Sequence, residues 1–176
     1  MKTINNFITE KLIINKNTKI NQYSYHPKDK DELKELINEI IEKCGENADL
    51  NDIDTSDITD MSSLFNNSDF NGNISEWNVS NVKDMSNMFS NSKFNGDISS
   101  WDVSNVEVFN FIFFKSNFNK DISKWNIEKA RLMNGMFWES EFEGNIDNWN
   151  PPKGYKHNLI FKNCPLEKNP PKWYKK

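Results

Sequence analysis

The sequence has few of the residues on which most enzyme chemistry depends. Its 176 residues include two cysteines, two histidines and six glycines, and no glycine-rich loop that could hold a phosphate group. Neither His26 nor His157 lies near a Ser or Cys motif typical of a catalytic triad, so we interpret both as ordinary surface or cap residues. We therefore expect a protein that is not an enzyme, with no catalytic residues, cofactor or metal.

Long apolar runs and an excess of one charge are missing as well. The longest unbroken apolar run, Phe111 to Phe114, is far shorter than the roughly 20 residues of a membrane helix, so we expect no membrane insertion. The net charge of −4 does not indicate nucleic-acid binding. No signal peptide is visible, which predicts a cytoplasmic or host-intracellular protein, or a cell-surface protein if a leader is missing.

Aromatic residues are abundant instead, and they recur every 24 residues. The 13 Phe and 6 Trp provide enough apolar surface for a folded core. Many columns of residues share this interval, which is the signature of a repeat protein. The clearest columns are Trp77, Trp101, Trp125 and Trp149; Phe70, Phe94, Phe118 and Phe142; and Phe65, Phe89, Phe113, Phe137 and Phe161.

Each repeat has the pattern of a strand followed by a short helix. Trp101 and Val103 flank the polar Asp102, which is the alternation of a half-buried strand. Met85 and Phe89 lie one helical turn apart on an apolar face. We predict an α/β repeat, a solenoid of the leucine-rich-repeat type, with short parallel β-strands on one face and short helices on the other. Stacked polar residues and a column of small side chains would satisfy the backbone at the corners: Ser68, Ser92, Ser116, Ser140 and Cys164.

The repeat unit resembles that of a known family. The stretch F-N-G-D-I-S-S-W-D-V-S-N-V, residues 94–106, is similar to the repeat of BspA-like leucine-rich repeat surface proteins, and residues 48–61 resemble the leading coil of the same family. The likeness extends from about residue 23 to the C-terminus. It implies a leucine-rich-repeat solenoid that binds proteins, often on bacterial surfaces, without catalytic residues.

The two ends have the character of caps. Residues 1–47 predict a hairpin, around the polar turn 15–18, and an amphipathic helix that starts at Asp29 with Glu32 in a capping box and stops at Gly45. Residues 48–153 form the repeats. Residues 154–176 form the C-terminal cap, in which Pro170 and Pro171 end the pairing between coils.

The cysteines and an acidic cluster have structural interpretations. Cys44 and Cys164 lie in opposite caps, roughly 20 Å or more apart at about 4.8 Å per coil, whereas a disulfide needs Cα atoms within about 7 Å. We predict two buried free thiols and, without a C-x-x-C motif, no zinc site. An acidic cluster could form a calcium loop, but it lacks the glycine and terminal glutamate of an EF-hand and falls in repeating polar columns, so we interpret it as structural: Asp52, Asp54, Asp57 and Asp60.

Departures from the repeat indicate a binding surface. Positions that are polar in the first two coils become apolar or aromatic in the third and fourth, which predicts an exposed patch for binding a partner. Self-association through the patch, or its burial by solenoid twist or by the C-terminal tail, are the alternatives. The patch consists of Val108, Phe111, Phe114, Leu132 and Trp138.

These features predict a non-enzymatic protein-binding solenoid. Its partner would be a protein whose identity the sequence does not reveal, and a homo-oligomer is a further possibility. Two alternative functions stay open. One is an intracellular inhibitor or effector that blocks a host or phage-defence protein, and the other is a self-assembling structural subunit.

Overall fold

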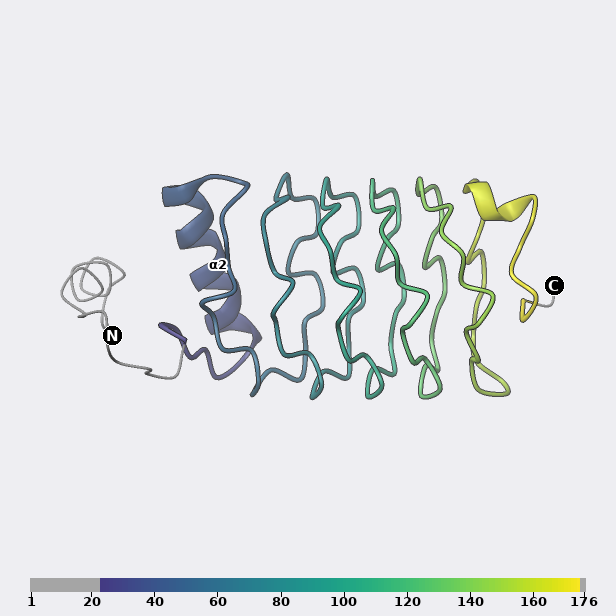
Figure 1. The fold of residues 1–176 in the computed structure, drawn as a ribbon, viewed down its shortest axis with the longest axis horizontal. Helices are drawn as coiled ribbons and strands as arrows, with labels where there is room; N and C mark the ends of the chain where they lie inside the picture. The colour runs from purple at the N-terminus through teal and green to yellow at the C-terminus, as the bar shows by residue number, and fades with distance from the viewer. Residues whose placement is uncertain (1–22, 175–176) are drawn as a thin grey trace.

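The protein is a stack of 24-residue coils that lie side by side along its long axis (Figure 1). This computed structural model describes residues 23–174. We number the coils as residues 58–81, 82–105, 106–129 and 130–153, followed by a partial fifth coil from residue 154. Helix α2 (Lys30–Cys44) covers the first coil, and the 3-10 helix η1 (Pro165–Glu167) lies at the other end.

The predicted α/β leucine-rich-repeat solenoid is wrong. Within residues 23–174, α2 is the only α-helix, η1 is the only other helix, and no β-strand is formed. Neighbouring coils share only isolated parallel bridges, which recur at one position of each repeat. These bridges link Asp60 to Asp84, Asp84 to Val108, Val108 to Leu132, and Leu132 to Lys156.

The repeats form no helices because their amides bond to the next coil. The N–H of Met85 donates to the carbonyl of Val108, and that of Asn87 to Asn110, both at 2.9 Å. A helix would direct these groups to the residue four positions earlier in the chain. Asn87 and Asn91 also adopt left-handed backbone conformations, with φ of 57° and 52°. In each repeat, two successive turns and not a helix therefore form the apolar face. These turns direct side chains inward at a spacing similar to that of a helix.

The predicted strands do not form because amide groups at these positions bond within their own coil. Trp101 and Val103 are buried and Asp102 is exposed, so the expected alternation of side chains is present. However, the amide of Trp101 bonds to Ile98 within its own coil, at 3.2 Å. The links to the previous coil come from side chains here, such as the Asn105 amide that donates to the Ser80 carbonyl at 2.8 Å.

The core is a continuous column of stacked aromatic rings. Phe89, Phe113 and Phe137 are buried, and the centroids of successive rings lie 5.8 and 5.7 Å apart. Within the third coil, Phe113 also stacks on Phe118, at 4.2 Å. No single coil could bury rings of this size, so each coil depends on its neighbours for stability.

The tryptophans form a second column that both packs and hydrogen-bonds. Trp77 stacks on Trp101 with centroids 6.4 Å apart, and Trp125 stacks on Trp149 at the same separation. Each indole N–H reaches a carbonyl 27 residues earlier, so the ring joins two coils. The pairs are Trp77 to Leu50, Trp101 to Ile74, Trp125 to Ile98, Trp149 to Ile122, and Trp173 to Ile146.

The predicted polar corners are present. The hydroxyl groups of the buried Ser92, Ser116 and Ser140 each donate to the carbonyl three residues earlier, at 2.9 to 3.0 Å. A ladder of asparagines links successive coils, because the side-chain oxygen of Asn110 accepts the amide of Asn134 at 2.9 Å. Side chains therefore satisfy backbone groups that no strand or helix serves.

The predicted N-terminal helix is confirmed. Asp29 caps α2 by accepting the amide of Glu32 at 3.0 Å, and Gly45 ends the helix with its N–H on the Ile41 carbonyl. Lys30 pairs with Asp60 at 3.0 Å, which ties the helix to the first coil. Apart from residues 23–25, the predicted hairpin lies outside the described residues.

Both cysteines are free, and one expectation about them is wrong. Cys164 is buried, as predicted, but Cys44 is exposed at the last turn of α2. Burial raises the pKa of the Cys164 thiol. The partly buried side chains of Leu36, Ile40 and Ile41 pack against the core. The contact between α2 and the core therefore does not require the Cys44 side chain.

Candidate functional site

Three aromatic side chains of the third and fourth coils pack on one another at the surface. Phe114 lies 5.1 Å from Trp138 and 6.0 Å from Phe111, measured between ring centroids, and Phe111 lies 6.4 Å from Trp138. All three are half-buried. We call this group the aromatic cluster. The equivalent positions in the first two coils hold the polar residues Ser63, Asn66, Asn87 and Ser90.

A glycine makes room for one ring of the cluster. Phe111 and Gly135 occupy equivalent positions of adjacent coils, and both have a φ of 57°. A Cβ atom at Gly135 would lie 2.4 Å from the Phe111 ring. Only glycine therefore allows the ring to rest against the backbone of the fourth coil.

Trp138 differs from the tryptophans of the core. Its indole N–H is buried but has no hydrogen-bond acceptor among the described residues, and it is the only such side-chain group found there. A buried donor without a partner costs about 1–3 kcal/mol. The unpaired donor therefore offsets part of the stability that the ring gains from its contacts at this position, where the preceding coils have Asn66, Ser90 and Phe114.

Lysines border the aromatic cluster. The ammonium group of Lys115 lies 5.2 Å from the centre of the Phe114 ring, and that of Lys162 lies 5.9 Å from the Trp138 ring. Both distances are within the range of cation–π attraction. Lys115 also pairs with Glu139 at 3.3 Å, whereas Lys162 makes no ion pair within the described residues.

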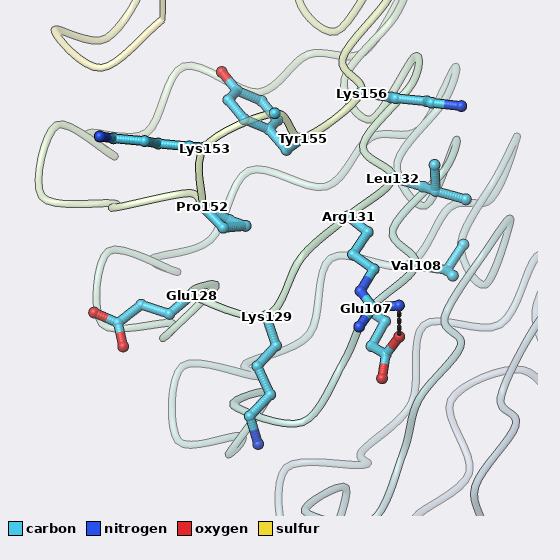
Figure 2. Close-up of a pocket in the computed structure, with 11 residues that line it drawn as sticks. Glu107, Val108, Glu128, Lys129, Arg131, Leu132, Pro152, Lys153, Tyr155 and Lys156 are labelled. Carbon is cyan, nitrogen blue, oxygen red and sulfur yellow. Dashed lines mark ion pairs between the residues drawn. The ribbon is translucent and has the colours of Figure 1, made fainter.

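Val108 and Leu132 line a hollow beside the bridges between the coils. The hollow has a volume of about 710 Å³, and we call it the groove (Figure 2). Its apolar lining also includes Pro152 and Tyr155 of the last coils. The remaining lining residues are Gly154, two acidic residues and four basic residues: Glu107, Glu128, Lys129, Arg131, Lys153 and Lys156.

Shrinking side chains and a shifted turn open the groove. The first residue of successive coils changes from Val82 and Val106 to Ala130 and then to Gly154. A Cβ atom added at Gly154 would meet no atom within 4 Å. The hydrogen bond that closes the turn shifts by one residue as well. In the regular coil the N–H of Ala130 donates to the Ile127 carbonyl, whereas in the last coil the N–H of Tyr155, the residue after Gly154, donates to the Pro152 carbonyl. The loop at 152–155 therefore departs from the packing of the coils before it.

The charges at the groove are only partly neutralised. Arg131 pairs with Glu107 at 3.4 Å, as the dashed line in Figure 2 marks, and the Lys129 ammonium donates to Asn105 at 2.6 Å. Lys153 and Lys156 make no ion pair within residues 23–174, and Figure 2 shows their ammonium groups directed away from one another. The groove thus combines an apolar lining with cations that have no carboxylate partner there.

The family is identified by one comparison. A family model described as "Mycoplasma protein of unknown function, DUF285" matches residues 33–149 and, in a second alignment, residues 90–173. The chain belongs to this family. No curated protein and no solved structure matches it. The description of DUF285 assigns no activity. It also does not indicate BspA-like proteins, and the resemblance to that family therefore stays a prediction.

The DUF285 match includes the whole candidate site, and the structure divides the predicted patch into two parts. Phe111, Phe114 and Trp138 form the aromatic cluster, whereas Val108 and Leu132 line the groove. All five side chains are half-buried rather than fully exposed, because they rest on the neighbouring coil. The repeat pattern did not indicate the following groove and cluster residues: Gly135, Lys153, Tyr155 and Lys156. The decrease from Val106 to Gly154 was the sequence signal that could have located the groove.

The other candidate residues of this DUF285 protein have ordinary structural contacts. His26 lies 3.2 Å from Asp54, and His157 packs on Tyr155 with ring centroids 4.5 Å apart. Among residues 23–174, no group of three or more His, Cys, Asp or Glu side chains could hold a metal ion. No helix in the same range is long and apolar enough to span a bilayer. Asp60 of the acidic cluster pairs with Lys30, as described above.

Proposed function

We propose that this protein is a non-enzymatic binding module that recognises another protein through the aromatic cluster and through the groove lined by the same two coils. The observation that carries the proposal is the replacement of polar residues by Phe111, Phe114 and Trp138 at surface positions of two adjacent coils. The buried Phe and Trp columns already supply the core of those coils. The additional rings therefore have a use outside the stack.

The geometry of the cluster suits an anchor for a partner. Its rings are held in place by one another and by the backbone at Gly135, so little conformational freedom remains to be lost on binding. Tryptophan and arginine, both present at this site, are enriched among the residues that dominate binding energy. The groove, lined by Val108 and Leu132 of the same two coils, offers a concave apolar surface in addition to this anchor.

The test uses ligands selected against the intact chain. Peptides from a displayed random library are enriched on the wild-type protein, and their Kd values are then measured on a variant that combines Phe114→Ser with Trp138→Ser. We expect the double variant to weaken binding at least about tenfold, the loss of roughly 1.4 kcal/mol. The matched control is Tyr23→Ser, which removes an exposed aromatic side chain at the opposite end of the molecule.

Two results would contradict the proposal. One is selected peptides that bind the double variant as tightly as wild type, while its unfolding curve shows that it is folded. The other is light scattering that shows a stable oligomer of the wild-type chain but a monomer of the double variant. The cluster would then serve self-assembly instead of recognition of another protein.

A further inference from the structure

We infer that the groove binds an extended acidic segment of the partner protein, with an apolar side chain of that segment on its lining. This inference rests on the proposed function and adds the chemistry of the partner. It starts from the balance of charge around the hollow, where four basic side chains face two carboxylates. Arg131 already pairs with Glu107, so three lysines and Glu128 remain, which is a net excess of two positive charges.

The positive charge of the groove is exceptional in this chain. The whole protein has a net charge of −4. Residues 23–60 contain twelve acidic and four basic residues, whereas residues 150–174 contain five lysines and one glutamate. Such a local excess raises the concentration of an acidic ligand at this end and speeds its association. Neither Lys153 nor Lys156 forms an ion pair with a carboxylate of residues 23–174.

The lining of the groove specifies more than charge. Val108, Leu132, Pro152 and Tyr155 provide apolar contacts in the same hollow as the lysines. Figure 2 shows Lys153 and Tyr155 on one side of the hollow, and Val108 and Leu132 on another. A peptide that follows the hollow between these groups would bury one apolar side chain and keep its carboxylates near the ammonium groups.

The same features argue against a nucleic acid as the ligand. A polyanion binds through many phosphate contacts, and these require a basic face along the protein. Here the second and third coils together carry as many acidic as basic residues, and the net charge of the protein repels a polyanion. The apolar lining would also stay unused by a phosphate backbone.

The experiment measures the binding of designed peptides to the full chain. The probes are fluorescein-labelled eight-residue peptides of Glu and Ser that carry one Leu or Trp at each position in turn, together with analogues in which Gln replaces Glu. Fluorescence anisotropy is recorded at low and high salt. We expect saturable binding of at least one acidic peptide, at least tenfold weaker binding of its Gln analogue, and a lower affinity at high salt.

Charge reversal then locates the site. We expect the double variant Lys153→Glu with Lys156→Glu to weaken binding of the acidic peptide at least tenfold. The matched control is Lys120→Glu with Lys124→Glu, which makes the same charge change at two exposed lysines outside the groove and should alter the affinity less than twofold. Equal losses in the two variants would overturn the inference, because only the overall charge would then matter.

Three further results would overturn the inference. They are equal binding of the Gln analogue, no saturable binding of any acidic peptide, and tighter binding of an eight-nucleotide oligothymidine at the same lysines. Peptides selected from the random library separate the inference from the proposed function. If they depend on Phe114 and Trp138 but are insensitive to reversal at Lys153 and Lys156, the binding module stands and the acidic ligand does not.

Discussion

Replacing tryptophan by phenylalanine should destabilise the protein in the core but leave its stability nearly unchanged at the candidate site. Trp125 donates its indole N–H to the Ile98 carbonyl at 3.1 Å, and its ring is buried. Trp138 has a buried indole N–H without an acceptor in the described part of the chain. The variants Trp125→Phe and Trp138→Phe therefore remove the same atoms but only one hydrogen bond.

The magnitudes follow from these contacts. At Trp125 the change removes a hydrogen bond worth about 0.5–1.5 kcal/mol and leaves a cavity beneath a smaller ring, so we expect a total loss of about 2–4 kcal/mol. At Trp138 the loss of apolar contact is offset by removal of the unpaired donor, which relieves about 1–3 kcal/mol. We expect the stability of Trp138→Phe to lie within about 1 kcal/mol of wild type.

Urea unfolding monitored by fluorescence and by near-ultraviolet circular dichroism measures both values. The comparison requires equal m-values, since a changed slope would indicate loss of a single cooperative transition in the repeat stack. Equal destabilisation by the two substitutions would refute the reasoning. It would mean that the indole N–H of Trp138 has a partner, or that the bond of Trp125 contributes nothing to stability.

Three other substitutions or treatments test separate features. Gly135→Ala and Gly154→Ala both place a side chain at positive φ, at a cost of about 1–2 kcal/mol, but only at Gly135 would the Cβ meet a ring, at 2.4 Å. Gly135→Ala should therefore have the lower urea midpoint, and equal midpoints would argue against the role of glycine in seating the cluster. Hydrogen bonds from Ser104 hold the pKa of Asp102 below its ordinary value of 3.8. Its contribution to stability is then present above that pH and lost as the pH falls through the lowered pKa. The free energy of unfolding of Asp102→Asn should therefore fall less steeply than that of wild type as the pH is lowered below that ordinary value. An unchanged acid transition would contradict this. A thiol reagent should modify Cys44 in the folded protein and Cys164 only after unfolding, as measured by mass spectrometry, and modification of both in native buffer would show that Cys164 is accessible.

Helix α2 was predictable because its signals are local. The Asp29 cap, the apolar spacing from Leu33 to Ile41 and the stop at Gly45 all lie within one continuous segment. Hydrogen bonds of a helix connect residues four apart, so a short stretch of sequence contains all the partners. The inward columns of Phe and Trp were predictable for a similar reason, since a fixed interval of 24 residues requires equivalent positions to share one environment.

The secondary structure of the repeats was not predictable in the same way. Met85 and Phe89 have the spacing of a helix face, but the acceptors of their amides lie 23 residues later, in the next coil. Local spacing does not distinguish a helical turn from two successive turns with left-handed residues, because both place the same side chains inward. Only stacking decides where the N–H groups bond.

The features of the candidate site likewise fall into those that the sequence predicts and those that depend on stacking of the coils. By itself the sequence determined where the repeat gains apolar residues, and thus the five side chains of the predicted patch. The tertiary structure decided that Phe111 rests against Gly135, that Trp138 has no acceptor, and that the loop at 152–155 opens a groove with Lys156 beside it. These features depend on contacts between coils, whose geometry is set by packing across the stack and not by any one repeat.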